Sequence, residues 1–96
     1  MIDFLLNEGY TDLVELPNGE LGGLYNFLST TGLVVGLTEH GYRVRYCFEN
    51  KSDARQALVT WDGEGHPNGN WIKAKGTDEY GVRIDEVNYN FANTLL

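Results

Sequence analysis

Residues 42–61 read YRVRYCFENKSDARQALVTW, and this stretch predicts a strand followed directly by a helix. Large and polar side chains alternate over residues 42–49, as in a strand with one buried face. The large side chains that we expect on that face are Tyr42, Val44, Tyr46 and Phe48. Arg43 and Arg45 then fall on the opposite face.

The second part of the stretch predicts the main helix, from about residue 52 to 61. Ser52 is a suitable N-cap, and Asp53 lies where the helix dipole favours an acid. Gly63 is placed to end the helix. The side chains that form one apolar stripe along it are Ala54, Ala57, Leu58 and Trp61. Strand and helix together make a unit whose apolar faces can pack.

Toward the N-terminus, residues 2–8 could form a short helix ended by Gly9, a strand over the same residues is the alternative, and further strands follow. The residues Pro17-Asn18-Gly19-Glu20 favour a hairpin turn between a strand over 11–16 and a returning strand over 21–29. A helix over 24–28 is the competing prediction for part of that segment. Residues 33–37 are apolar at nearly every position, which is typical of a strand covered on both faces.

Toward the C-terminus, residues 62–70 read as a loop rich in glycine and are followed by two more strands. In the first, 71–75, alternation places Trp71, Lys73 and Lys75 on one face. The second runs near 82–89, and its alternation slips at Asp85-Glu86, which suggests a bulge or the end of the strand. Residues 90–96 are predicted to form a tail or a short segment docked by Phe91.

These elements predict a single α+β domain over residues 1–96. Its fold is a mostly antiparallel sheet of five to six strands, with the helix at about 52–61 packed on one face. The chain has 96 residues, of which 42% are hydrophobic and 12% aromatic, and this composition fits a folded domain.

All seven lysine and arginine residues lie after residue 42, in a chain whose net charge is −7. Residues 1–42 contain six carboxylates and no lysine or arginine, whereas residues 43–96 contain eight carboxylates. Binding to nucleic-acid phosphates needs a basic surface, so we expect no direct contact with a nucleic-acid backbone. The acidic first half suits solvent or a basic partner, and its candidate partner face comprises Glu15, Glu20 and Glu39.

The single cysteine, Cys47, excludes an internal disulfide and favours a reducing compartment, of which the cytoplasm is the simplest. The first eight residues, MIDFLLNE, contain acids and no basic residue, so we expect no signal peptide. No apolar run approaches the length of a membrane-spanning helix, and we expect no membrane partner.

The densest group of chemically special residues is WDGEGHPNGNWIKAKG, at 61–76. Asp62, Glu64 and His66 alternate there and could converge on a divalent metal, but Pro67 stands where a calcium loop has glycine. His66 as a base with Glu64 as its orienter is another alternative, although spacing ties no nucleophile to this pair. We expect a surface loop, with no metal and no cofactor.

Basic side chains recur on two strands that could be neighbours, namely Arg43, Arg45, Lys73 and Lys75. With Trp71 beside them and His66 at the edge, they could bind an anion, a nucleotide base or an acidic peptide. The alternative is a mixed-charge face that pairs with acids from the first half of the chain. A sheet-to-sheet dimer could also bring acidic and basic regions together across a two-fold axis.

The pattern WDGxGHPxGxWIKxKG over residues 61–76 resembles stretches in small uncharacterised proteins of bacterial phages and other mobile elements, including integron cassettes. It covers about a sixth of the chain. The resemblance implies a bacterial accessory or interaction protein, and it gives no residue a role.

From these observations we expect a small acidic, non-enzymatic binding protein that acts through protein–protein contacts, with another protein or as a homodimer. Its candidate surface is the acidic first half together with loop 62–71. The first alternative is a small-ligand or anion-binding domain that uses the basic face and Trp71. The second alternative is a small metal-dependent or histidine-based enzyme around His66.

Overall fold

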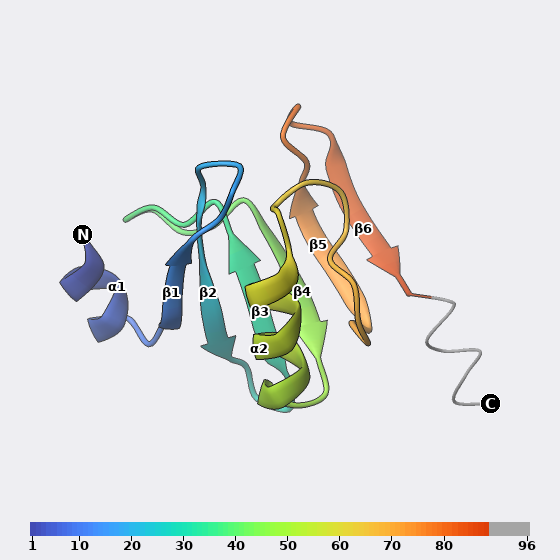
Figure 1. Ribbon diagram of the computed structural model, residues 1–96, viewed down its shortest axis with the longest axis horizontal. Coiled ribbons are helices and arrows are strands. Elements are labelled where there is room, and N and C mark those ends of the chain that lie inside the picture. Colours follow the sequence, from blue (N-terminus) through green and yellow to red (C-terminus); the bar gives the residue numbers. More distant parts are fainter. Residues whose placement is uncertain (89–96) are drawn as a thin grey trace.

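The chain folds as an α+β protein in which one six-stranded antiparallel sheet carries two helices (Figure 1). The structure is a computed structural model and describes residues 1–88. The strands lie in chain order from β1 to β6, so each pairs with its neighbours in sequence. The elements are α1 (Ile2–Asn7), β1 (Thr11–Glu15), β2 (Leu21–Asn26), β3 (Thr31–Val35), β4 (Val44–Phe48), α2 (Lys51–Thr60), β5 (Lys73–Thr77) and β6 (Arg83–Val87). The predicted fold class, main helix and short N-terminal helix are confirmed.

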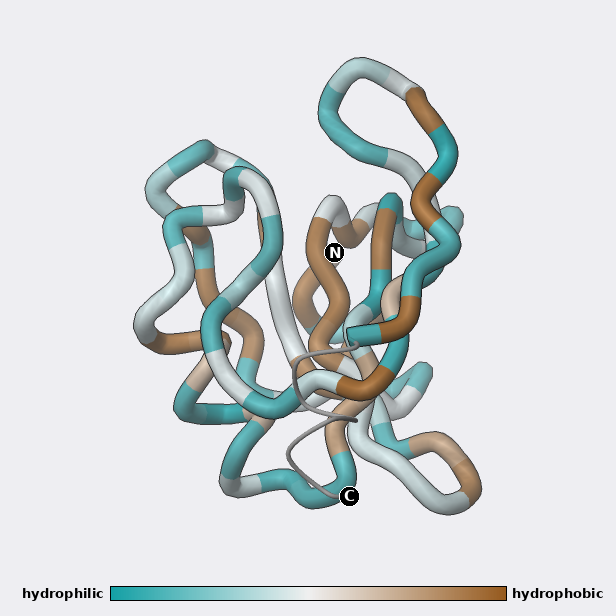
Figure 2. Tube along the Cα trace, turned by 90° about the vertical axis from the view of Figure 1, so that its right-hand side faces the viewer, coloured by the Kyte–Doolittle hydropathy of each residue, from teal (hydrophilic) through white to brown (hydrophobic). Residues whose placement is uncertain are grey.

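The main core lies between α2 and one face of the sheet. Strand β4 contributes Val44, Tyr46 and Phe48, as predicted, and α2 contributes Ala54 and Leu58. Burying a side chain of leucine size contributes about 1.5–3 kcal/mol, so this packing fixes α2 on the sheet. Figure 1 shows α2 lying across β3 and β4, and Figure 2 shows hydrophobic colour along the strands with mostly hydrophilic turns.

A smaller core lies on the opposite face of the sheet, under α1. Leu5 of α1 clusters with Val34 of β3 and with Leu37, and all three are buried. Tyr10 and Tyr42 pack partly buried against this cluster. Strand β3 is therefore covered on both faces, as its continuous apolar sequence predicts. Among residues 1–88, no helix covers this face at β4, β5 and β6.

The turn between β1 and β2 forms at the predicted position. Gly19 has a φ angle of +90°, which other residues rarely adopt. The N–H of Leu16 donates to the carbonyl of Glu20 at 2.8 Å and closes the hairpin. Residues 21–26 then continue as strand β2, so the competing helix over 24–28 is wrong.

A bend at Arg43 changes the predicted face of one aromatic residue. Strand β4 begins at Val44, after the bend, so Tyr42 does not share a face with Val44. Its hydroxyl instead accepts a hydrogen bond from Nη1 of Arg45 at 3.1 Å, on the face opposite α2. Arg43 turns away from Arg45 and binds Glu20. The strict alternation predicted over 42–49 therefore holds only within β4.

Two local predictions also need correction. Helix α2 is capped by Asn50 and not by Ser52, because the Asn50 side chain accepts the N–H of Asp53 at 2.9 Å. The pairing of β5 with β6 continues through Asp85-Glu86, so the predicted bulge is absent there. The irregularity lies in β1, where Asp12 has a φ angle of +54° and the register shifts.

The predicted docking of the tail by Phe91 lies outside the described residues. Within residues 1–88, neither helix is long and apolar enough to cross a membrane.

Candidate functional site

A cavity of about 380 Å³ opens between α1, the end of β2 and the segment 38–42. We call it the aromatic cavity. It lies on the sheet face opposite α2, where Tyr25 and Tyr42 point. Its lining residues are Phe4, Leu5, Glu8, Tyr10, Tyr25, Phe27, Thr38, Glu39, His40, Gly41 and Tyr42. The volume is at the lower end of the range for small-ligand sites and also suits a single long side chain.

Five of the eleven residues that line this cavity are phenylalanine or tyrosine. The ring centroids of Tyr10 and Tyr25 are 5.0 Å apart, and those of Tyr25 and Phe27 are 5.1 Å apart. Burial raises the pKa of the Tyr10 hydroxyl, and the neighbouring Tyr42, Tyr25 and Glu8 raise it further. Every aromatic residue within the first 42 positions belongs to this wall.

The charged groups that line the aromatic cavity are carboxylates. Glu8 and Glu39 are both exposed there, and Nε2 of His40 lies 3.7 Å from Oε1 of Glu39. No lysine or arginine belongs to the lining found within residues 1–88. The faces of aromatic rings carry partial negative charge, so the wall and the carboxylates attract the same kind of ligand, a cation.

The side chain of Arg45 already contacts two residues of this wall. The guanidinium carbon of Arg45 lies 5.1 Å from the ring centroid of Phe27, while Nη1 donates to the Tyr42 hydroxyl. That hydrogen bond raises the pKa of Arg45. The arrangement shows the geometry in which the wall accepts a guanidinium, and it leaves the part near Tyr10, Glu8 and Glu39 open.

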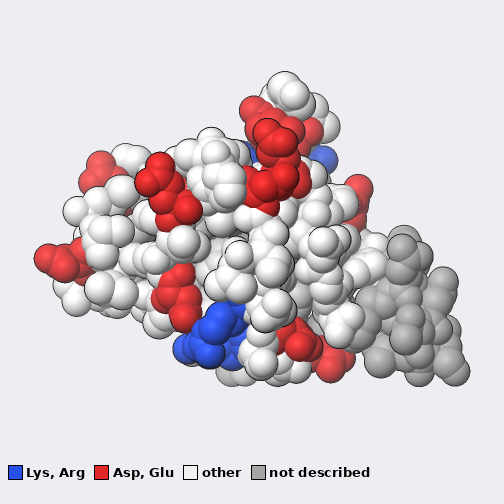
Figure 3. Space-filling view, viewed as in Figure 1, with Lys and Arg blue, Asp and Glu red and all other residues white. Residues whose placement is uncertain are grey.

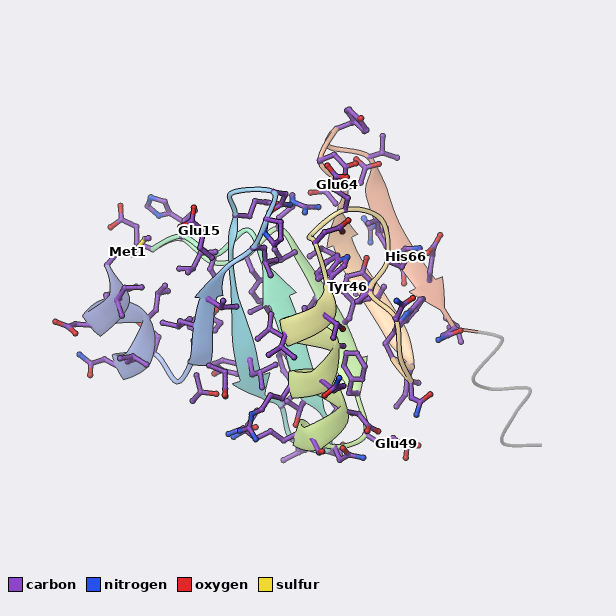
Figure 4. The ribbon with its side chains drawn as sticks, viewed as in Figure 1. Met1, Glu15, Tyr46, Glu49, Glu64 and His66 are labelled. Carbon is purple, nitrogen blue, oxygen red and sulfur yellow. The ribbon has the colours of Figure 1, made fainter. Side chains whose placement is uncertain are left out.

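The three predicted partner-binding acids have different surroundings in the structure. Only Glu39 lines the aromatic cavity. Glu15 lies exposed at the end of strand β1, far in Figure 4 from Glu64 and His66. Glu20 makes a two-point ion pair with Arg43, whose Nη2 and Nε lie 2.7 and 3.0 Å from its carboxylate oxygens. That pairing lowers the pKa of Glu20 and offsets its charge.

The predicted ligand face with Trp71 is not assembled. Trp71 precedes β5 and is buried in the main core, where its ring centroid lies 5.4 Å from that of Tyr46. Lys73 points to the opposite face, because it lies directly across from Cys47 in the β4–β5 pair. Arg43 is occupied by Glu20. The alternation that placed Trp71 beside Lys73 fails because strand β5 begins only at Lys73.

Part of the predicted basic face does form on the uncovered half of the sheet. Arg45 lies directly across from Lys75, and Cys47 directly across from Lys73. Residues directly opposite in an antiparallel pair share a face, so these bases are neighbours. We call Arg45, Lys73 and Lys75 the basic strip. It lies beside the aromatic cavity, to which the bond from Arg45 to Tyr42 connects it.

The face that carries α2 has a different charge pattern. Figure 3 shows carboxylates scattered over it, one compact group of basic atoms near the bottom of the view and a few basic atoms near the top. At the start of α2, Nζ of Lys51 and Nε of Arg55 lie 3.8 and 3.1 Å from the carboxylate of Asp12. Partial burial alone would raise the pKa of Asp12, but hydrogen bonds from Thr11 and Arg55 lower it on balance. These two bases are therefore paired within the chain.

His66 takes part in a row of hydrogen bonds that joins the glycine-rich loop to the sheet. Its Nδ1 lies 2.8 Å from the hydroxyl of Tyr46, and its Nε2 lies 2.6 Å from Oε2 of Glu86 on β6. The Tyr46 hydroxyl also donates to the carbonyl of Gly65 at 3.3 Å. Figure 4 shows Tyr46 and His66 next to each other near β5. Burial raises the pKa of Tyr46, which is 1% exposed.

This row suits a structural clamp better than proton transfer to a substrate. A catalytic base needs a nitrogen that a substrate can reach, and both ring nitrogens of His66 face protein partners. The predicted orienter, Glu64, instead accepts the indole N–H of Trp61 through its backbone carbonyl at 3.0 Å. Within residues 1–88, no three His, Cys, Asp or Glu side chains gather as a metal-binding group.

The sequence contained signals for the sites that were not predicted. The aromatic residues of the first half are spread over α1, strand β2 and three connecting segments, and the fold brings them together. Their concentration in a stretch without lysine or arginine was the available signal. Glu86, 20 residues after His66, carried no such signal, because only the pairing of β6 with β5 brings it near.

Comparisons of the chain with protein-family models, with curated proteins and with solved structures find no match. The fold and the site define a structural class, an antiparallel six-stranded meander with α2 on one face and α1 on the other. Its distinguishing feature is an aromatic cavity lined by carboxylates beside α1.

Proposed function

We propose that the protein is a non-enzymatic binding protein that recognises a basic protein partner, and that the aromatic cavity receives a lysine or arginine side chain of that partner. The observation that carries this proposal is the composition of the cavity. Aromatic rings and the carboxylates of Glu8 and Glu39 converge there, all from the part of the chain that has no lysine or arginine. The net charge of −7 further attracts a basic partner.

The physical basis is the combination of two weak attractions. A cation over an aromatic face gains about 0.5–1 kcal/mol at an exposed site, and more when water is excluded. A carboxylate near the same cation adds a charge interaction of about 0–1 kcal/mol at the surface. An inserted side chain would contact the wall that Tyr10 and Tyr25 form. The carboxylates of Glu8 and Glu39 would attract the same side chain.

The surroundings of the cavity favour a protein partner over a small free cation. Helix α1, which forms one wall, exposes apolar side chains that a small ion would not cover: Met1 is 65% exposed, Ile2 47% and Leu6 51%. Exposed apolar groups beside a charged pocket are typical of protein-binding surfaces. The resemblance of residues 61–76 supports a bacterial accessory or mobile-element protein, and the single Cys47 supports the cytoplasm as its location.

A lysine-rich peptide carrying a fluorescent label tests this function by anisotropy. We expect the wild-type chain to bind it, and the Glu8→Gln/Glu39→Gln variant to bind about tenfold more weakly. The matched control is Glu49→Gln, which changes an exposed glutamate at the other end of the sheet. Affinity should also fall with added salt. Equal binding by the variant and the wild type would refute the proposal.

The three acids that the sequence predicts as a partner face allow a second test, in which the effects of their charge reversal on binding are compared. Charge reversal at Glu39 should weaken binding, because Glu39 lines the cavity. Reversal at Glu15 should have a smaller effect, since Glu15 is not part of the lining. Glu20 is unsuitable for this comparison, because its reversal would break the ion pair with Arg43.

A further inference from the structure

Lys73 and Lys75 of the basic strip make no ion pair within the part of the chain that the structure describes, although Asp85 of β6 lies directly across from Lys75. No carboxylate oxygen lies within 4.0 Å of Lys73 or Lys75 there, whereas Arg43, Lys51 and Arg55 all have ion-pair partners. Arg45 and Lys75 moreover lie directly opposite each other, and like charges in that position repel. A cluster of this kind in a chain with a net charge of −7 is suited to an external acidic group.

The basic strip and the aromatic cavity share one face of the sheet. Tyr25 of the cavity lies across from Gly32, Gly32 across from Cys47, and Cys47 across from Lys73, so all four positions face the same side. Tyr25 and Lys73 are three strand spacings apart, which is about 14 Å. An acidic, aromatic half and a basic half therefore lie side by side on one surface.

The two halves also differ in height. Helix α1 and the segment 36–42 cover the sheet on the side of β1, β2 and β3, whereas Arg45, Lys73 and Lys75 stand on bare strands. A two-fold axis parallel to the strands, passing between the halves, would set the raised half of one copy on the bare half of the other. The same operation would bring each basic strip over the other copy's aromatic cavity.

We propose that the basic partner is a second copy of this chain, and that Lys73 and Lys75 of each copy bind at Glu8 and Glu39 of the other. This inference rests on the proposed function, because it uses the same cavity and the same cation chemistry. The interface is isologous, so each favourable contact occurs twice. The lysines that make no ion pair and the cavity with its two glutamates are then two parts of one interface.

Charge reversal on either side tests the dimer, with mass in solution measured by light scattering and sedimentation. We expect the wild-type chain to dimerise, and Lys73→Glu/Lys75→Glu to raise the dimer dissociation constant at least about tenfold. The variant Glu8→Lys/Glu39→Lys should do the same. The control Glu49→Lys should dimerise like the wild type.

The decisive measurement mixes the two reversed variants. One then carries an acidic strip and an acidic cavity, and the other a basic strip and a basic cavity, so both contacts of the pair become favourable. We expect a heterodimer to form in the mixture, and a homodimer to return when all four reversals are placed in one chain. Circular dichroism checks that each variant is folded, and the neutral pairs Lys73→Gln/Lys75→Gln and Glu8→Gln/Glu39→Gln repeat the test with smaller changes.

Each other outcome overturns the inference in a recognisable way. A wild-type chain that stays monomeric but binds the lysine-rich peptide shows that a different basic protein occupies the cavity, and the proposed function stands. A wild-type chain that stays monomeric and binds no peptide refutes both the dimer and the proposed function. A dimer that survives every reversal uses another surface, and the peptide measurement then decides the proposed function separately.

Discussion

Replacing Tyr46 by phenylalanine isolates the hydrogen bond that fastens the glycine-rich loop to the sheet. The ring stays packed against Trp61 and Trp71, whose centroids are 5.3 and 5.4 Å away. The hydroxyl loses its contacts with Nδ1 of His66 at 2.8 Å and with the Gly65 carbonyl at 3.3 Å. Since the His66 side chain is 42% exposed and can bind water instead, we expect a loss of about 1 kcal/mol.

A double-mutant cycle measures this bond directly. The wild type, Tyr46→Phe, His66→Ala and the double variant are unfolded in urea at one protein concentration and followed by tryptophan fluorescence. We expect a coupling energy of about 1 kcal/mol between the two substitutions. The melting temperature of Tyr46→Phe should fall by about 4–8 °C, as is usual for a domain of this size. Tyr80→Phe is the control, because Tyr80 is 84% exposed.

Two results would contradict the reasoning. A coupling energy near zero would mean that the Tyr46 hydroxyl and His66 do not stabilise each other. A loss above about 3 kcal/mol for Tyr46→Phe would exceed the value of one hydrogen bond and would imply altered ring packing.

Three further predictions use the same unfolding assay. Leu33→Ala should cost about 2–5 kcal/mol, because Leu33 is 0% exposed, whereas Leu28→Ala, at a fully exposed position, should stay within about 0.5 kcal/mol of the wild type. Hydrogen bonds from Arg43 lower the pKa of Glu20 in the folded protein. The stability that this ion pair contributes is therefore fully present above the pKa of Glu20 in the unfolded chain, about 4.3. It is lost as the pH falls through the lower pKa of Glu20 in the folded protein. Glu20→Gln should therefore lower stability at neutral pH and flatten its decline with acid; an unchanged pH profile would disprove this. Gly76→Ala should cost more than about 1 kcal/mol, because Gly76 has a φ angle of +141° and an added Cβ would clash with the backbone of Arg43; a neutral result would contradict that geometry.

The parts of the fold that were predicted correctly depend on local sequence patterns. The alternation from Val44 to Phe48 and the apolar stripe at Ala54, Ala57 and Leu58 both describe faces that are buried against each other. The hairpin at Gly19 needs a backbone conformation that its own residues favour. Where a segment's neighbours in sequence decide its structure, reading the sequence was sufficient.

The errors lie where contacts distant in sequence decide the direction of a side chain. Arg43 leaves the strand geometry to reach Glu20, which lies 23 residues earlier, and this bend reverses the face of Tyr42. Trp71 joins the aromatic cluster around Tyr46 before β5 begins. The aromatic cavity was not predicted for the same reason, because its wall comes from segments that only the folded sheet brings together.

The chain-order arrangement of the strands has a kinetic consequence. Each strand finds its partner after a short loop, apart from the pair β4–β5, whose connection contains α2. Forming such a sheet requires few closures of long loops, and so its entropic barrier is low compared with sheets that interleave distant segments. Assembly can start at a hairpin such as β2–β3 and extend outward one strand at a time. The last pair, β5–β6, can then form or open as a hairpin while the rest of the sheet stays closed.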